Sequence, residues 1–242
     1  MKKIILMLVF LASVVSCGFC KDNVFKVGIS PDYPPFEYVE DGKITGFDYD
    51  FMNALADEIN IKLEFVSMDF SGLISALSSG KLDIVISGVT KTKERAKRVD
   101  FTKPYYKSVS LYVKLKTNSS IKSKEDLVGK KVAAQLGTVQ ADDIVSMHGV
   151  KAEINQDPMF FVMGVLSGKI DAFLIDEAVA FEYVKKYPEL EIFDKKIYED
   201  KGKVIAVRKG NKELLEKLDS AILKLEENGK YQEIAKKYNL AL

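Results

Sequence analysis

Three places in the sequence carry residue types that bind charged groups. The guanidinium of Arg95 is suited to two parallel, charge-assisted hydrogen bonds with a carboxylate, which a lysine cannot make. Gly137 and Thr138 stand between an expected strand and an expected helix, and the free N–H groups at a helix N-terminus form a natural anion site. Asp176 follows an apolar run at the carboxyl end of an expected strand, where open α/β sheets bind their ligands. These residue types suit a small molecule that carries a carboxylate and an ammonium group.

Each of these features also has an ordinary structural interpretation. Gly137 and Thr138 are equally consistent with a tight turn and a threonine cap, and Asp176 with the N-cap of the next helix. Arg95 stands among other cations typical of a solvated helix, namely Lys91, Lys93, Lys97 and Arg98. The residues alone therefore leave a binding role and a structural role both open.

Short β-rich runs alternate with helical runs along most of the chain. This alternation predicts the α/β class, with mainly parallel sheets flanked by helices. Strands are expected at residues 25–29, 61–66, 82–86, 108–114, 131–134, 170–175 and 204–207. Helices are expected at residues 48–60, 71–79, 157–168, 176–187, 211–229 and 230–238, with shorter ones opening at Ser123 and near Thr138. We find no floppy linker and no internal repeat, which favours two lobes that hinge about short strands.

The N-terminus has the pattern of a secretory signal. A short basic start precedes an apolar run from Ile4 to Val15, which is too short to span a bilayer comfortably. We expect residues 1–16 to be removed and residues 17–23 to form a tether. The stretch from Val14 to Cys17 resembles a lipobox and predicts lipid modification of Cys17. Cleavage between small residues nearby is the alternative, and Cys20 is a second cysteine close by.

The composition argues against several classes of protein. Without residues 1–16, the 36 basic and 35 acidic residues become 34 and 35, so no basic excess suggests nucleic acid. No cysteine follows Cys20, so the body is expected to fold without a disulfide. The one histidine, His148, has no neighbouring pattern of metal ligands and is expected at the surface. We expect no metal and no cofactor.

Short motifs spread over the body of the chain carry a family resemblance. They are, in order, Asp32-Tyr33-Pro34-Pro35-Phe36-Glu37, Gly46-Phe47-Asp48-Tyr49-Asp50, Asp69-Phe70-Ser71-Gly72-Leu73-Ile74, Ile86-Ser87-Gly88-Val89-Thr90, Glu94-Arg95, the run from Asp100 to Tyr106, Leu136-Gly137-Thr138 and the run from Asp171 to Asp176. Each motif is weak alone. In this order they resemble the family-3 bacterial extracellular solute-binding proteins, the polar amino acid binders of ABC transporters.

The resemblance implies a two-lobed periplasmic-binding-protein type II fold. Lobe 1 is expected to comprise residues 24–111 and 200–242, and lobe 2 residues 112–199. Hinges are expected near residues 111–113 and 198–201. The ligand would bind first to lobe 1, and lobe 2 would then close over it.

The resemblance also assigns roles to individual residues. Arg95 would bind the carboxylate of a free amino acid, helped from the opposite lobe by Gly137, Thr138 and, less directly, Gln140. Asp176 would bind the ammonium group. The remaining polar contacts to the ligand are expected from the Gly88 carbonyl and the Thr90 hydroxyl. Aromatic walls around the ligand side chain are expected from Tyr33 and Phe70, whereas Phe36, Phe47 and Phe101 are assigned to the core.

The identity of the amino acid is less closely specified. Ser30 stands at the position where the lysine/arginine/ornithine binders carry an acid, so the sequence departs from that pattern. Asp32 and Asp69 remain as nearby acids, and with the aromatic walls they favour arginine or lysine. Glutamine or another polar amino acid is the alternative.

The expected partners are a free L-amino acid and an ABC transporter permease. The protein is expected to be a monomer outside the cytoplasm, in contact with the membrane through a lipid anchor only. One rival is a cyclohexadienyl dehydratase-type enzyme on the same fold, in which Glu37, Asp32 or Asp69 would serve as the general acid. A receptor sensor or a transglycosylase module is disfavoured because the chain ends at Leu242, soon after the last expected helix.

Overall fold

The computed structural model describes residues 24–240, apart from the side chains of residues 199–201. The predicted signal (1–16), the predicted tether (17–23) and Cys17 lie outside the described residues. Within residues 24–240, no helix combines the length and the apolar character that a membrane span requires.

The first lobe is built on a five-stranded sheet in the order β5-β1-β6-β13-β7. Its strands are β1 (Val24–Ile29), β5 (Lys62–Ser67), β6 (Ile84–Val85), β7 (Val99–Phe101) and β13 (Ala206–Arg208). The first three are parallel to one another, whereas β13 is antiparallel to both β6 and β7. The helices of this lobe are α1 (Phe47–Glu58), α2 (Phe70–Ser78), α3 (Lys93–Ala96), α7 (Lys212–Glu227) and α8 (Lys230–Lys237).

The second lobe repeats this arrangement in the order β10-β9-β11-β8-β12. Its strands are β8 (Tyr106–Leu115), β9 (Lys131–Gln135), β10 (Lys151–Asn155), β11 (Ala172–Asp176) and β12 (Leu190–Lys203). The three strands β10, β9 and β11 are parallel, and β8 is antiparallel to β11 and β12. The helices are a 3-10 turn (Lys124–Leu127), α4 (Val139–Ser146), α5 (Pro158–Leu166) and α6 (Glu177–Lys186).

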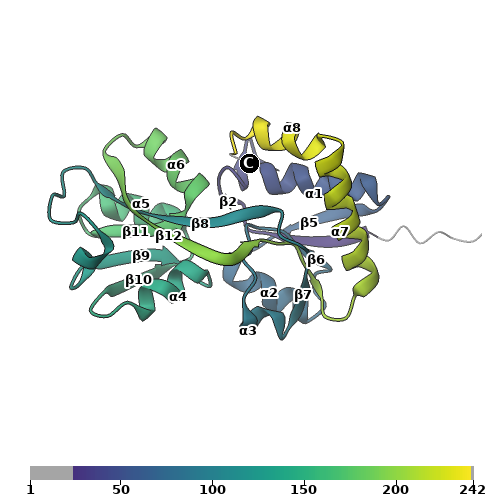
Figure 1. Ribbon diagram of the computed structural model, residues 1–242, viewed down its shortest axis with the longest axis horizontal. Coiled ribbons are helices and arrows are strands. Elements are labelled where there is room, and N and C mark those ends of the chain that lie inside the picture. Colours follow the sequence, from purple (N-terminus) through teal and green to yellow (C-terminus); the bar gives the residue numbers. More distant parts are fainter. Residues whose placement is uncertain (1–23, 241–242) are drawn as a thin grey trace, which may run out of the picture.

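The strands β8 and β12 connect the two lobes as an antiparallel pair, visible across the middle of Figure 1. Residues Ser110 to Lys114 of β8 pair with β11, so the predicted hinge at residues 111–113 lies inside the second sheet. The pairing of β12 with β8 shifts register between Ile197 and Gly202. We therefore place the crossings at residues 106–109 and 198–202, and the predicted lobe boundaries at 111/112 and 199/200 stay a prediction.

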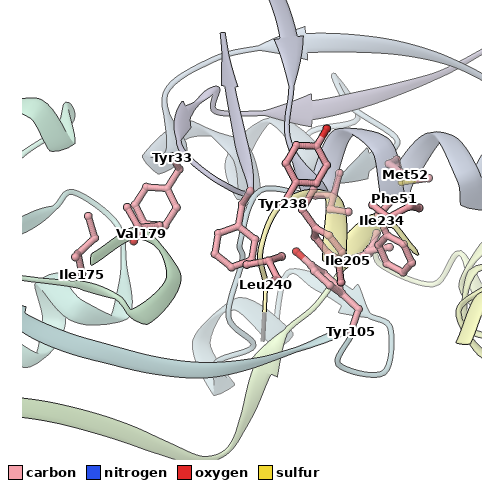
Figure 2. Packing of buried hydrophobic residues seen from close by; sticks show 14 of the residues in the cluster. Tyr33, Phe51, Met52, Tyr105, Ile175, Val179, Ile205, Ile234, Tyr238 and Leu240 are labelled. Carbon is pink, nitrogen blue, oxygen red and sulfur yellow. The ribbon is translucent and has the colours of Figure 1, made fainter. Parts of the chain in front are cut away.

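The buried residues form a core that continues from one lobe into the other. In the first lobe, Phe47 stacks on Phe51 with ring centroids 5.4 Å apart. Phe36 and Phe47 are buried, as predicted, and Phe101 is partly buried. At the lobe junction, Figure 2 shows Tyr33 beside Ile175 and Val179 of the second lobe. The apolar contact across the junction therefore reaches the edge of the cleft.

Many of the helices and strands were predicted, but the strands β7, β10 and β12 and a small three-stranded sheet were not. It consists of β2 (Asp32–Tyr33), β3 (Glu37–Glu40) and β4 (Lys43–Thr45). Pro34 and Pro35 stand between its first two strands, and prolines argue against a strand in a sequence-based prediction. This sheet matters for function because it holds Tyr33 and Glu37 at the cleft.

Candidate functional site

A narrow cleft lies between the lobes. Both lobes line it, and the strand ends β6, β9 and β11 meet there. The lining residues are Asp32, Tyr33, Glu37, Phe70, Ser87, Gly88, Thr90, Arg95, Gln135, Thr138, Val139, Gln140, Asp176 and Lys203. Polar groups outnumber apolar ones in this set, which suits a small polar ligand.

The guanidinium of Arg95 lies at the junction of the lobes. One of its terminal nitrogens donates to the Thr90 carbonyl (2.5 Å) and the other to the Gly137 carbonyl of the second lobe (2.7 Å). Its central carbon lies 5.5 Å from the centre of the Phe70 ring, in cation–π geometry. Burial lowers the pKa of Arg95 to about 10, so the group remains a cation at neutral pH. The side chain is therefore not the freely solvated helix charge that the alternative interpretation described.

Asp176 ends β11 and precedes α6, but its side chain makes no capping hydrogen bond. The Oδ2 atom accepts hydrogen bonds from the Tyr33 hydroxyl (3.0 Å) and from Nζ of Lys203 (2.5 Å). The Oδ1 atom is buried and has no hydrogen-bond partner within residues 24–240. A buried, unpaired carboxylate oxygen is costly, so this atom needs a donor. Asp176 therefore occupies the N-cap position of α6 without a capping side-chain bond, and its Oδ1 keeps an unused acceptor.

The turn after β6 carries Gly88 and Thr90. The Gly88 N–H donates to a carboxylate oxygen of Asp48 (2.7 Å), and the Gly88 backbone has a φ of 53°, which favours glycine. The Tyr105 hydroxyl also donates to this carboxylate (2.9 Å). The Thr90 hydroxyl lies 3.4 Å from that of Ser108. Asp48, from α1, thus fixes the turn that faces the cleft.

In the second lobe, Thr138 caps the N-terminus of α4. Its hydroxyl accepts from the Ala141 N–H (3.1 Å) and donates to the Gln135 carbonyl (2.7 Å). The Thr138 N–H also donates to the Gln135 carbonyl (3.2 Å). The Gln140 amide donates to the Ser110 hydroxyl (2.9 Å). The threonine cap is therefore present, and it holds the start of α4 against the cleft.

Two acids line the cleft with raised pKa values. Burial raises the pKa of Asp32 to about 6, although hydrogen bonds from Gln135 and Ser30 oppose the shift. Burial, followed by repulsion from the Asp48 carboxylate, raises the pKa of Glu37 well above its usual range. One oxygen of Glu37 accepts from the Ser87 hydroxyl (2.7 Å), and the other has no hydrogen-bond partner in the described part of the chain. Burial therefore favours the neutral form of both carboxyl groups.

Most residues predicted for the site do line the cleft. They are Arg95, Asp176, Thr138, Gly88, Thr90, Tyr33, Phe70, Asp32 and Gln140. Ser30 and Gly137 are not among the lining residues. The Ser30 N–H bonds to the Ser87 hydroxyl (3.0 Å), and a Cβ on Gly137 would lie 3.0 Å from Cα of Ser71. The roles of these residues in binding stay a prediction.

Five lining residues were not assigned to ligand binding from the sequence. They are Glu37, Ser87, Gln135, Val139 and Lys203. Ser87 and Gln135 stand at or just after the ends of β6 and β9. Ligands of open α/β sheets bind at the carboxyl ends of strands, so the argument used for Asp176 could have found these two residues as well. Lys203 carries no such signal, because a lysine in a charged stretch is typical of solvent-exposed chain.

His148 is exposed, as predicted, and lies in the turn after α4. Among residues 24–240, no group of three or more histidine, cysteine, aspartate or glutamate side chains is placed to hold a metal ion.

Comparison with known proteins gives matches over the whole described chain. The model of the bacterial extracellular solute-binding proteins, family 3, matches residues 25–241. A probable histidine-binding protein of Campylobacter jejuni subsp. jejuni serotype O:2 is 38% identical over 216 residues, which cover 89% of this chain and 84% of the relative. An arginine-binding extracellular protein of Bacillus subtilis (strain 168) is 38% identical over 218 residues, which cover 88% and 84%.

Solved structures agree with the sequence relatives. An ancestral arginine-binding protein bound to arginine superposes with a TM-score of 0.85 at 41% identity, covering 89% of this chain and 97% of that one. An ancestral arginine-binding protein bound to glutamine gives a TM-score of 0.84 at the same identity and coverage. The two-lobed type II fold predicted from the motifs is thus confirmed. The chain belongs to the bacterial extracellular solute-binding proteins of family 3.

Proposed function

We propose that this protein binds a free basic amino acid, arginine in the first place, in the cleft between its lobes and delivers it to an ABC importer. One observation carries the proposal. The Arg95 guanidinium and the unpaired Oδ1 of Asp176 come from opposite lobes and line the same cleft. An α-amino acid carries the two complementary charges on one carbon, so it satisfies both groups at once.

The acids of the cleft favour a basic side chain. Asp32 and Glu37 line the same space as the aromatic rings of Tyr33 and Phe70. Aromatic faces attract a cation, and a guanidinium or ammonium tip stabilises a carboxylate that burial has made reluctant to ionise. The relatives support the same choice, since they include an arginine-binding protein and a probable histidine-binding protein.

Glutamine is the second candidate, because amide partners also line the cleft. Gln135 and Gln140 are both buried there, and burial raises the pKa of Glu37, which favours the neutral carboxyl group that can donate to an amide. The fold itself accepts this ligand, since an ancestral arginine-binding protein has also been solved with glutamine.

We assign binding rather than catalysis to the cleft. A dehydratase needs a general acid that reaches the leaving hydroxyl of its substrate. Asp32 is instead bonded to Gln135 across the lobes (3.1 Å), and Glu37 is held by Ser87. Asp69 precedes α2 and does not line the cleft.

Closure of the lobes would follow ligand binding. Hydrogen bonds already join the lobes. Besides the bonds from Tyr33 and Lys203 to Asp176, they include those from Arg95 to the Gly137 carbonyl, from Gln135 to Asp32, and from Gln156 to the Ser71 hydroxyl (2.8 Å). A ligand that contacts Arg95 of one lobe and Asp176 of the other stabilises only the closed form. Ligand binding therefore shifts the population toward the closed form. The permease would recognise this closed shape.

The first test is a thermal-shift screen of the purified protein, without the signal, against the twenty amino acids, ornithine and citrulline. Arginine should raise the melting temperature most, because a ligand at 100 times its Kd stabilises the native state by about 2.7 kcal/mol. A shift with glutamine alone would favour the second candidate. A screen without any shift, together with turnover of a cyclohexadienyl acid, would replace the binding function by an enzymatic one.

Substitution of Arg95 tests the carboxylate contact. Arg95→Ala should weaken arginine binding by about 3–5 kcal/mol, or roughly 100-fold or more, because a buried carboxylate loses its partner. Titration calorimetry measures the effect. Arg98→Ala is the control and should leave the affinity unchanged, since the Arg98 guanidinium donates to the hydroxyls of Ser75 and Ser78, which do not line the cleft. Near-wild-type affinity in Arg95→Ala would remove this residue from the site.

The pH dependence of affinity tests the role of Asp32. Its pKa of about 6 in the free protein should fall when a cationic side chain binds, so acidification through pH 6 opposes arginine binding. From pH 7.5 to pH 5 we expect about a tenfold loss of arginine affinity, against little change for the neutral isostere citrulline. Asp32→Asn should flatten the arginine profile. An unchanged profile in this variant would assign the titration to another acid, such as Asp48.

We also propose export followed by lipid attachment at Cys17, on the sequence pattern alone. Mass spectrometry of the protein from membrane fractions should show a diacylglyceryl-modified N-terminal cysteine, and Cys17→Ser should abolish the modification. An unmodified N-terminus at another small residue would establish ordinary cleavage instead.

A further inference from the structure

Lys203 is a buried cation inside the cleft. Its side chain is 2% exposed, and its Nζ lies 2.5 Å from Oδ2 of Asp176, whose own side chain is 6% exposed. Burial of a charge is costly unless the charge is paired, so this ion pair explains why the lysine is tolerated there. The ion pair therefore places a fixed ammonium group on Asp176, the same carboxylate that we propose binds the ammonium group of the ligand.

The backbone of Lys203 is attached to the first lobe. The Tyr105 N–H donates to the Lys203 carbonyl (2.8 Å), and Lys203 forms an isolated β-bridge with Thr90. Asp176 belongs to β11 of the second lobe. The ion pair therefore joins the two lobes, and it is lost when they separate.

The surroundings leave Lys203 within reach of the ligand site. Its Nζ lies 5.9 Å from the centre of the Phe36 ring and 3.8 Å from the position that a Cβ on Gly88 would take. The Asp48 carboxylate is also near enough for the positive charge of Lys203 to lower its pKa, although burial has the larger, opposite effect. The charged groups that line the cleft around it are Asp176, Asp32, Glu37 and Arg95.

The Asp176 carboxylate can accept only a limited number of hydrogen bonds. The Tyr33 hydroxyl and Nζ of Lys203 already share Oδ2, which leaves Oδ1 for a further donor. A ligand ammonium at Oδ1 would lie next to a like charge, or it would displace Lys203. Either event reduces the free energy gained from the ligand.

We propose that Lys203 determines both the affinity and the ligand preference of this site, as a tethered ammonium that competes with the α-ammonium of the ligand for Asp176. This inference rests on the proposed function. It has two consequences. The ion pair stabilises the closed form without ligand, and the fixed charge disfavours ligands whose second cation lies close to Cα. A long basic side chain, as in arginine, is tolerated better than a short one.

The experiment compares Lys203→Met and Lys203→Gln with a matched control, Lys114→Met. Lys114 is the other buried lysine among the described residues, 4% exposed, and it pairs with Glu191 inside the second lobe. Lys203→Gln keeps a hydrogen-bond donor for Oδ2 and removes the charge, so it also serves if the methionine variant does not fold. Calorimetry with L-arginine and L-2,4-diaminobutyrate gives affinities, and small-angle scattering gives the radius of the ligand-free protein.

Both Lys203 variants should bind arginine about tenfold more tightly than the wild type, because one like charge is removed from the carboxylate. The gain should be larger for diaminobutyrate, and the ligand-free radius should increase. Lys114→Met should change neither affinity nor radius.

Weaker binding by the Lys203 variants would overturn the inference and make Lys203 a direct ligand contact. Unchanged affinity and radius would overturn it as well. If the wild type and all variants bind no amino acid, the proposed function and the competition with a ligand both fail. In that case, the radius of the ligand-free variants, compared with that of the wild type, still shows whether the ion pair holds the lobes together.

Discussion

The buried carboxylate of Asp176 is the constraint on which the arrangement of the cleft depends. A carboxylate with almost no exposure to water must find donors, and here they come from both sides of the lobe junction. Lys203 and Tyr33 belong to the first lobe, whereas Asp176 belongs to the second. One oxygen is satisfied by these contacts and the other is not. The same carboxylate therefore draws the lobes together and retains the capacity to bind a cation.

The topology explains why the polar groups converge at this point. In each lobe the parallel strands end at the cleft, and the turns after β6, β9 and β11 carry its binding groups. The crossing strands β8 and β12 hold the two sheet edges opposite each other (Figure 1). In the motion that we propose, a rotation about the two short crossings opens the cleft and separates the apolar residues that meet at the lobe junction. Asp48 supports this arrangement from behind, because it fixes the Gly88 turn while remaining fully buried.

Many of the strands, helices and cleft-lining residues could be predicted from the sequence. Those that were missed share a physical cause. Asp176 and Thr138 were found because strand ends and helix starts leave local signals. The strand β12 and the small sheet around Tyr33 were missed because charged residues and prolines hide the alternation that marks a strand. Lys203 was missed for a related reason. Its burial follows from contacts with Asp176 and Tyr105, which are remote in the sequence, so no local pattern indicates it.

The charge balance of the cleft connects the buried groups to ligand choice. The ion pair of Lys203 and Asp176 lies close to three further acids, Asp32, Glu37 and Asp48, whose pKa values burial raises. A ligand with a cationic side chain brings a positive charge to these acids, whereas a neutral zwitterion does not. Lys203 already supplies one such charge to Asp176. The lysine thus makes the buried acids tolerable in the folded protein, at the cost of some attraction for the cationic ligand.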